Sequence, residues 1–257
     1  MRGQTDLMLK TLPGFVRKRL DPAERFGLRA TLFAIAVTLV AVPFGLLLDQ
    51  VVRHGDLVGL DTAAARNLHH LVRGHPILID LLKVLTFVGT PPWLFAVVAI
   101  AVIFLWRRGR RRLVAYLIVT SIAGGVIDSV VKIIVNRPRP NLENPIILAH
   151  GKSFPSGHAM SSTIVYGAIL LAFIPAVPQA RRRLLFLGYF FLVAMIGFSR
   201  LALGVHYLTD VVGGYVLGAA WLVASTAAFS IWRQERGRQP VKPLRGVEPE
   251  AKSDLKA

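Results

Sequence analysis

The chain has 257 residues, 54% of them hydrophobic, and a mean hydropathy of +0.54. This composition excludes an ordinary soluble domain and predicts a protein with several membrane-spanning helices. The absence of cysteine excludes disulfides and thiolate chemistry, whereas the formal net charge of +17 raises the question of a nucleic-acid partner.

The N-terminal residues 1–29 are polar and basic, and we expect them to form a cytoplasmic segment. The first apolar run, residues 30–48, is 19 residues long. No small-x-small cleavage site follows it, because the chain continues with Asp49 and Gln50. We therefore interpret the run as a first transmembrane helix and not as a cleaved signal peptide.

Residues 60–89 combine apolar and polar positions. Ile77, Leu81, Leu82 and Leu85 recur at helical spacing, which favours an amphipathic helix lying at the membrane interface. An ordinary packing helix explains the same spacing equally well, so both interpretations stay open.

Five more apolar segments bring the predicted number of spans to six. Two are shorter than the roughly 20 residues that cross a bilayer, and we expect them to extend into residues 85–90 and to Leu201. The predicted fold class is all-α: an integral membrane six-helix bundle over residues 30–232, with interfacial helices between spans one and two. Residues 233–257 are rich in charge and proline and are predicted to be a disordered cytoplasmic tail. The five segments are residues 92–106, 113–135, 160–177, 184–198 and 211–231.

Lysine and arginine alternate sharply between the two sides of this arrangement. Of the 31 basic residues, 22 lie before span one, between spans two and three, between spans four and five, or after span six. The positive-inside rule then predicts that both termini are cytoplasmic. Because such alternation is typical of membrane topology, we expect no nucleic-acid partner.

Three polar clusters lie on the opposite, non-cytoplasmic side of this six-span arrangement. Charged residues beside apolar spans are costly, so each cluster is a candidate functional site, and together they predict a pocket for a phosphate group. The clusters are Lys132 to Pro140, Pro155-Ser156-Gly157-His158, and Ser199-Arg200 with His206 and Asp210.

In the first cluster, Lys132 lies near the outer end of the third span, and two prolines that stop the helix bracket Arg139. The two cations can approach the same phosphate. The alternative is that these side chains reach lipid headgroups, and Arg137 is the arginine that we expect to do so. Asp128, four residues before Lys132, is expected to orient the lysine as an ion pair.

The second cluster precedes the fourth span. Gly157 permits a close approach of the backbone, and a helix start with the Ser156 hydroxyl is suited to an anion. His158 can then give a proton to a leaving oxygen. A capped loop with an interfacial histidine is the alternative.

In the third cluster, the spacing of His206 and Asp210 puts a carboxylate beside the imidazole on a helix. The carboxylate fixes the tautomer and leaves the other ring nitrogen free to attack, which predicts a phosphohistidine intermediate. Arg200 can supply a third cation, although an ordinary surface His–Asp pair remains the alternative. The clusters themselves contain one acid, so we expect no metal site.

In order and spacing, the clusters resemble the signature of the type 2 phosphatidic acid phosphatase (PAP2) superfamily, which includes the vanadium haloperoxidases. The family pattern is Lys, six residues, Arg-Pro; then Pro-Ser-Gly-His; then Ser-Arg, five residues, His, three residues, Asp. No position of this chain departs from it. The matching residues are Lys132, Arg139-Pro140, Pro155-Ser156-Gly157-His158, Ser199-Arg200, His206 and Asp210.

The resemblance implies that His206 is the nucleophile and Asp210 the carboxylate that orients it. It implies that His158 is the general acid and then the base that activates water. It also implies a helical bundle with a pocket at the membrane surface and no metal or other cofactor. The implied phosphate-binding residues are Lys132, Arg139, Ser156, Gly157 and Arg200.

We therefore expect a membrane hydrolase that cleaves a lipid phosphate or diphosphate at the outer face of a bacterial inner membrane. Undecaprenyl diphosphate is the leading candidate; phosphatidate, phosphatidylglycerol phosphate and lipid A phosphates are alternatives. A lipid phosphotransferase and a non-enzymatic lipid or anion carrier are the competing functions. No obligate protein partner is evident, and six spans suit a lipid better than the soluble oxidant of a haloperoxidase.

Overall fold

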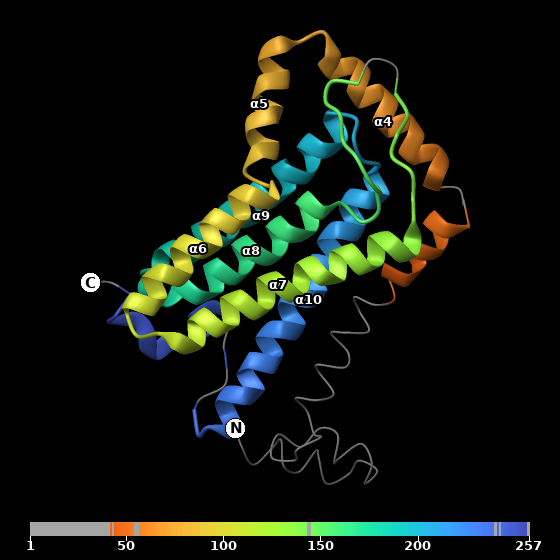
Figure 1. The fold of residues 1–257 in the computed structure, drawn as a ribbon. Helices are drawn as coiled ribbons and strands as arrows, with labels where there is room; N and C mark the ends of the chain where they lie inside the picture. Colours follow the sequence, from red (N-terminus) through yellow and green to blue (C-terminus); the bar gives the residue numbers. More distant parts are fainter. Residues whose placement is uncertain are drawn as a thin grey trace, which may run out of the picture. The chain divides into compact units, whose positions relative to one another are not determined.

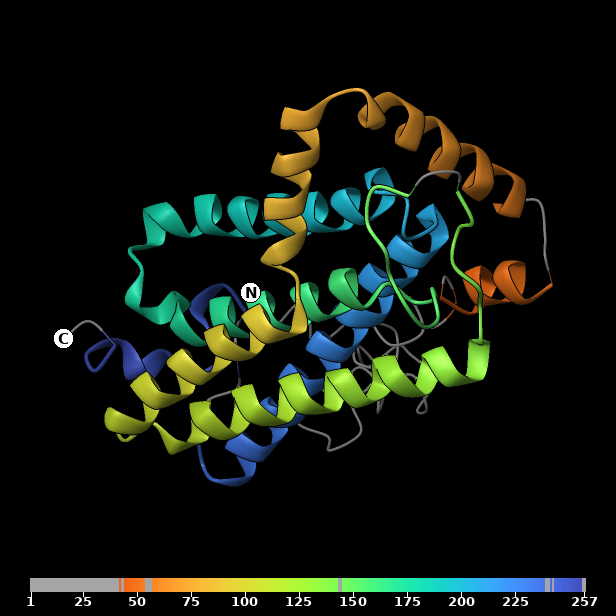
Figure 2. The ribbon, with the colours of Figure 1, turned by 45° about the horizontal axis from the view of Figure 1, so that its top comes forward.

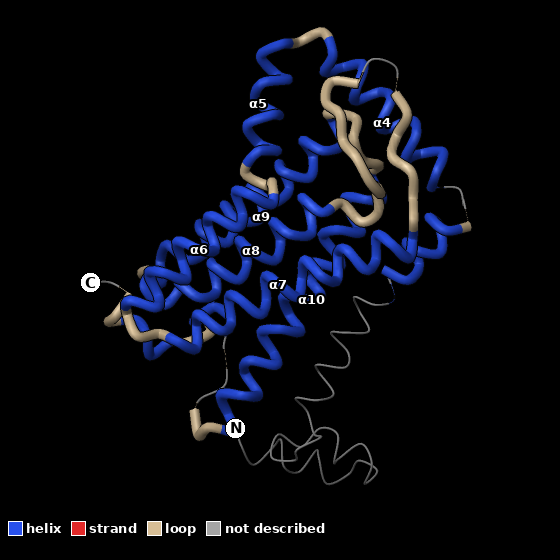
Figure 3. The backbone as a smooth tube through the Cα atoms, in the orientation of Figure 1, coloured by secondary structure: helices blue, strands red, loops and turns tan. Residues whose placement is uncertain are grey.

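The structure is a computed structural model, and every regular element in its described residues is helical (Figure 1, Figure 3). The predicted N-terminal segment and most of the predicted first span lie outside these residues, although residues 44–52 are helical. Within this part of the chain, the predicted all-α class is confirmed. The described residues are 42, 44–53, 57–142, 145–238, 241 and 243–255.

The bundle helices run alongside one another in alternating directions (Figure 1). α8 lies at the centre, where it packs against all the others. The apolar stretch of α8 is 61% buried and that of α7 only 11%, so α7 presents most of its surface outward. The bundle helices are α6 (Pro91–Arg107), α7 (Arg111–Val135), α8 (Gly157–Phe173), α9 (Gln179–Ala202) and α10 (Leu208–Glu235).

By length and composition, α7, α9, α10 and α8 with its extension η1 (Ile174–Ala176) can each cross a membrane. α5 (Pro76–Phe87) and α6 can do so as a pair, bent by 46° at the break between them. The described residues thus hold four or five candidate spans, and the predicted count of six is not confirmed. Ile133 on α7 and Phe191 on α9 are 76% and 68% exposed, as expected for helices that face lipid.

The predicted amphipathic helix before the second span is two helices, α4 (Leu57–Arg73) and α5. Pro76 begins α5, because its fixed φ suits a first helical turn and the missing N–H costs nothing there. α4 contacts α9 and α10, and α5 contacts α9, so both lie over the end of the bundle where α9 ends (Figure 2). That they lie at a membrane interface stays a prediction.

α8 and α10 approach each other closely because two glycines of α10 face the backbone of α8. A Cβ atom at Gly214 would lie 2.7 Å from the carbonyl oxygen of Ser156, and one at Gly218 would lie 2.9 Å from that of Met160. A larger residue does not fit at either place, so the four-residue spacing of the glycines lets the helices touch.

The C-terminal tail differs from the prediction of disorder. α10 continues to Glu235, and η2 (Pro243–Arg245) and η3 (Pro249–Lys252) follow it. Val247, Ala251 and Leu255 are buried in the apolar core, and the buried Arg233 pairs with Glu250 at 2.6 Å. The prediction is wrong for residues 243–255, because these apolar positions at four-residue spacing outweigh the charge and proline content of the segment.

Candidate active site

The three polar clusters meet at one end of the bundle. α7 and α9 end there, while α8 and α10 begin there. Lys132 lies in the last turn of α7 and Arg200 in the last turn of α9. His158 and Asp210 lie in the first turns of α8 and α10. The alternating helix directions therefore bring distant parts of the sequence together.

His206 lies between α9 and α10, with its side chain 2% exposed. Its Nδ1 atom lies 3.3 Å from Oδ2 of Asp210, and its Nε2 atom lies 3.0 Å from Nη1 of Arg139. A guanidinium only donates hydrogen bonds, so Nε2 is the acceptor and the ring proton belongs on Nδ1.

The imidazole of His206 is neutral near pH 7. Burial lowers the pKa of His206 to about 4, although the hydrogen bond and the charge of Asp210 act in the opposite direction. The ring therefore keeps a lone pair on Nε2, on the side of Arg139, which is the form that a nucleophilic imidazole requires.

Asp210 is fully buried and is held through both of its carboxylate oxygens. Oδ2 accepts the backbone N–H of Tyr207 at 2.9 Å, which caps the start of α10. Oδ1 accepts Nη1 of Arg137 at 2.6 Å. These bonds fix the carboxylate against the imidazole of His206.

The turn into α8 is the second part of the site. Ser156 donates its backbone N–H to the carbonyl oxygen of Asp210 at 2.9 Å. Nζ of Lys132 donates to the carbonyl oxygen of Pro155 at 2.8 Å and to Oδ1 of Asp128 at 2.5 Å, so the predicted ion pair is present. A Cβ atom at Gly157 would lie 3.2 Å from that Nζ, so glycine leaves room for the lysine.

Around this turn, buried polar atoms lack a hydrogen-bond partner within the described residues. They are Oγ of Ser156, Nε2 of His158 and Nε of Arg200. His158 is also within electrostatic range of Arg200, His206, Arg139 and Lys132. Buried polar groups without partners are costly, and the oxygens of a phosphoryl group supply the acceptors that these donors require.

α5 contributes to this arrangement through a residue that the sequence analysis did not single out. Nη1 of Arg200 donates to Oγ1 of Thr86 at 2.7 Å, and both side chains are buried. The contact uses one nitrogen of the guanidinium and leaves Nε for a ligand. The sequence offers no spacing that would have linked Thr86 to Arg200, because the two are far apart in the chain.

The prediction that Arg137 reaches lipid headgroups is wrong. Its side chain is 8% exposed and lies between the carboxylates of Asp210 and Asp61. Asn136 ends α7 with a left-handed φ of 53°, and the chain changes direction just before Arg137. Asp61 of α4 and Thr209, which both contact Arg137, were also missed by the sequence analysis.

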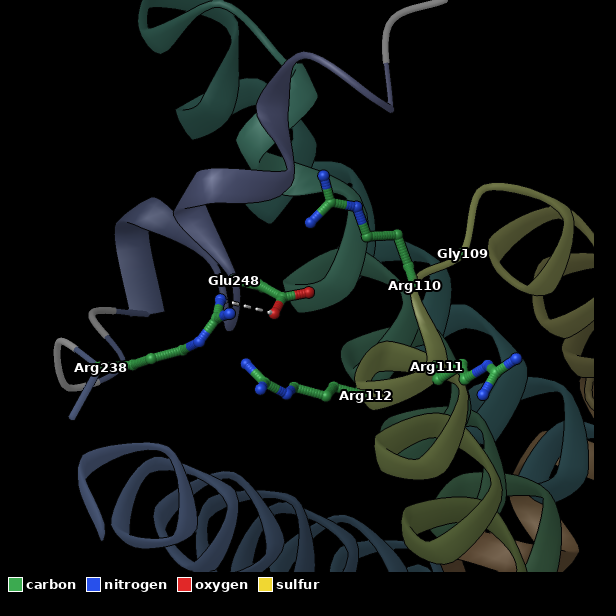
Figure 4. A pocket seen from close by; sticks show the side chains of 6 residues that line it. All are labelled: Gly109, Arg110, Arg111, Arg112, Arg238 and Glu248. Carbon is green, nitrogen blue, oxygen red and sulfur yellow. Dashed lines mark ion pairs between the residues drawn. The ribbon is translucent and has the colours of Figure 1, made fainter. Parts of the chain in front are cut away.

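A separate cavity of about 260 Å³ lies at the other end of α7 and is lined by arginines and Glu248 (Figure 4). Arg110 there pairs with Asp254, and Arg238 lies 3.8 Å from Glu248. The cavity is about 30 Å from Lys132, given 1.5 Å per helical residue, and contains none of the clustered residues. Across the described parts of the chain, no group of three His, Asp or Glu side chains is arranged to hold a metal ion.

Comparison with known proteins agrees with this geometry. The sequence model of the PAP2 superfamily matches residues 112–234, which include every residue of the three clusters. Residues 112–234 thus carry the sequence of a PAP2 superfamily region. This match and the long apolar helices of the bundle indicate an integral membrane protein whose relatives are lipid phosphatases.

Its relatives are bacterial PAP2 proteins. Phosphatidylglycerophosphatase B of Bacillus subtilis is 29% identical over 147 residues, which are 56% of this chain and 71% of the relative. Undecaprenyl-diphosphatase BcrC of Bacillus subtilis is 31% identical over 132 residues, 48% of this chain and 64% of the relative. The crystal structure of a transmembrane PAP2 phosphatidylglycerolphosphate phosphatase from Bacillus subtilis superposes with a TM-score of 0.70 at 22% identity, over 79% of this chain and 97% of that one. This last similarity shows the fold.

Proposed function

We propose that the protein hydrolyses a lipid phosphate or diphosphate through a phosphohistidine intermediate on His206. The observation that carries this proposal is the setting of the imidazole, whose Nδ1 faces Asp210 while its Nε2 faces Arg139. A neutral ring with an oriented lone pair is a nucleophile, and surrounding cations stabilise the charge that phosphoryl transfer spreads over the equatorial oxygens.

In the first step, the lone pair of His206 Nε2 attacks phosphorus, and the bond from phosphorus to the leaving oxygen breaks. A protonated His158 gives its proton to that oxygen. The leaving group is the lipid alcohol for a monoester and the lipid monophosphate for a diphosphate. Lys132, Arg139 and Arg200 hold the non-bridging oxygens, with the N-terminal turn of α8 behind them.

In the second step, water gives a proton to His158 and attacks phosphorus. The bond from phosphorus to Nε2 breaks, its electron pair returns to the ring, and inorganic phosphate leaves. Asp210 stabilises the positive ring of the phosphohistidine through the Nδ1 proton. The cations in both steps are side chains of the protein, so we expect the reaction to proceed without a metal.

For the substrate, similarity to phosphatidylglycerophosphatase B supports phosphatidylglycerol phosphate, and similarity to BcrC supports undecaprenyl diphosphate. Both are phosphates on lipid anchors, which suits a site at the end of apolar helices. Undecaprenyl diphosphate is the substrate that the sequence predicts first, and the phosphatidylglycerol phosphate of the other relative is the second candidate.

We further propose that the site opens on the periplasmic or extracellular side of a bacterial inner membrane. The arginines of Arg110–Arg112 and of the α10 C-terminus lie at the opposite end of the bundle from His206. The positive-inside rule favours a cytoplasmic location for that arginine-rich end. Labelling of single cysteines introduced at Lys152 and at Arg236 with a membrane-impermeant reagent tests this orientation.

Release of phosphate from a panel of purified lipid phosphates, with EDTA present, tests the activity. We expect release from at least one lipid by the wild type and none by the His206→Ala variant. Full activity of that variant would exclude the mechanism. Labelled phosphate that passes into a second lipid would favour a phosphotransferase, and lipid movement in the His206→Ala variant would favour a carrier.

A further inference from the structure

Asp61 of α4 enters the site from outside the region that matches the family. It lies before residues 112–234, and its side chain is 1% exposed. Oδ1 accepts the backbone N–H of Thr209 at 2.9 Å, and Oδ2 accepts both the Thr209 hydroxyl and Nη2 of Arg137, the latter at 2.8 Å. Both oxygens of this carboxylate thus bind the N-terminal turn of α10, and Oδ2 also binds Arg137.

Arg137 joins this carboxylate to the one beside the nucleophile. Nη2 donates to Asp61, while Nη1 donates to Oδ1 of Asp210 at 2.6 Å and to the Thr209 hydroxyl at 2.8 Å. The guanidinium carbon also lies 4.2 Å from the centre of the Tyr207 ring. The rigid, planar fork of arginine suits such a bridge, and lysine, as a single point charge, does not reproduce it.

The charges of Asp61, Arg137 and Asp210 depend on one another. Burial acts to lower the pKa of Arg137, but the charges and hydrogen bonds of Asp210 and Asp61 raise it above its usual value. Removing one charge from a buried network leaves the others unpaired and free to rearrange. Without Asp61, the fork of Arg137 keeps one carboxylate, Asp210, which is the same group that must stay directed at Nδ1 of His206.

We propose that Asp61 and Arg137 are positioning residues for the nucleophile: Asp61 fixes Arg137, and Arg137 fixes the carboxylate of Asp210 that sets the tautomer of His206. The inference rests on the proposed function of His206. Neither residue touches the reacting phosphate in this proposal; both act through Asp210.

A purely structural role is the competing explanation, because the same contacts fasten α4 to α10. If the contacts only hold α4 against α10, variants of Asp61 and Arg137 should be less stable while the protonation pattern of the His206 ring stays unchanged. A positioning role predicts that the nitrogen atoms of His206 change their protonation pattern even in a folded protein. The tautomer of the ring therefore separates the two explanations.

The experiment uses the full chain in detergent, with Asp61→Asn and Arg137→Lys as test variants. Asp80→Asn and Arg73→Lys, on the exposed sides of α5 and α4, are the matched controls. The ¹⁵N chemical shifts of the His206 ring are recorded at pH 7 without substrate. Values of kcat and KM are measured with short-chain phosphatidylglycerol phosphate in micelles, and thermal unfolding verifies that each variant is folded.

We expect kcat to fall at least tenfold in both test variants, with KM changed less than threefold, because the lost interaction acts on the chemical step. The ring of His206 should show a mixture of tautomers, whereas the controls should match the wild type. Folded test variants with wild-type nitrogen shifts and a kcat within twofold of the wild type would overturn the inference. If Asp61→Asn does not fold, Asp61→Glu takes its place. This variant keeps the charge but moves the carboxylate away from its position on Arg137, so the same changes in kcat and in the His206 tautomer are expected.

Failure of the inference is distinguishable from failure of the proposed function. A wild-type protein that releases no phosphate and forms no phosphohistidine would overturn the function. The nitrogen shifts need no substrate, so they report on Asp61 and Arg137 in either case.

Discussion

Nη1 of Arg139 lies 3.0 Å from Nε2 of His206, the atom proposed to attack phosphorus. The same nitrogen donates to the carbonyl oxygen of Val205 at 2.8 Å, and Nε donates to that of Gly151 at 3.2 Å. The guanidinium is thus held by the backbone of two loops directly at the nucleophilic atom. A phosphate that binds there meets the arginine and the lone pair together.

The Arg139→Lys variant should therefore lose about 10- to 100-fold in kcat/KM. Lysine keeps the charge but cannot span the loop carbonyls, Nε2 and a phosphate oxygen at once. Phosphate release from the best lipid of the panel measures the loss. Lys152→Arg, on an exposed position of the same loop, is the control, and equal activity of both variants would argue against a role for the Arg139 fork.

Substitution of His158 and of His206 should block different steps of the reaction. With an aryl phosphate, whose leaving group needs little help from an acid, His158→Ala should still form the phosphohistidine and then hydrolyse it about 10²- to 10⁴-fold more slowly. His206→Ala should form no adduct at all. Denaturing the enzyme after mixing with ³²P-labelled substrate and counting base-stable label tests both outcomes; label on His206→Ala would identify another nucleophile.

The stability of the protein should fall as the pH decreases from about 6.5 to about 4. His206 has a pKa of about 4 in the folded protein, below its ordinary value, so the unfolded chain binds the proton more readily across this window. Above pH 6.5 the ring is neutral in both states and contributes no pH dependence. Thermal unfolding of the wild type should therefore decline more steeply with acid than that of His206→Gln, and parallel curves would contradict the burial argument.

Gly214→Ala should both destabilise the protein and impair the site. The added Cβ would lie 2.7 Å from the backbone oxygen of Ser156, which has no rotamer with which to move away. Overpacking of this kind costs about 1–3 kcal/mol, and here it displaces the phosphate-binding turn as well. Gly125→Ala on α7, with no atom within 4 Å of its Cβ, is the control and should be neutral or stabilising by thermal unfolding.

Because the tail packs on the bundle away from the site, a substitution in it should lower the stability of the protein without changing its activity. Val247 is fully buried, and its backbone N–H donates to the carbonyl oxygen of Leu171 at 3.0 Å. Val247→Asp should lower the unfolding temperature, because a buried carboxylate without a partner is costly, yet leave the kcat of the folded fraction unchanged. The exposed Arg245→Asp provides the comparison; if both variants unfold at the wild-type temperature, the tail does not pack on the bundle.

The sequence predicts contacts between residues that are close together in the chain better than contacts between distant residues. The Lys132–Asp128 pair lies within α7 at a spacing of four residues, so helical periodicity alone predicts it. The His206–Asp210 pair has the same spacing, but His206 precedes α10 instead of lying on a helix as predicted, so the contact depends on the capped turn in which Asp210 accepts the Tyr207 N–H.

The end of α7 at Val135 follows from apolar length, whereas α10 begins three residues before and ends four residues after the predicted span 211–231. Arg137 shows the limit: its direction depends on Asp61, 76 residues earlier on a helix whose docking no local pattern encodes. The buried side of the tail was missed because composition averages over the few apolar residues that pack.

The close contact of α8 and α10 at Gly214 and Gly218 also restricts how the protein can move. α8 carries His158, the proposed proton donor, and α10 carries Asp210, whose carboxylate orients the nucleophile. The hydrogen bond from the Ser156 N–H to the Asp210 carbonyl oxygen joins the two helices at the site. Separating them would break that bond and lose the packing, so slow hydrogen exchange is expected at the Ser156 amide. Any opening that admits a lipid must then occur around this pair, by displacement of the α5–α6 bend or of the loops, while the reacting groups keep a constant separation.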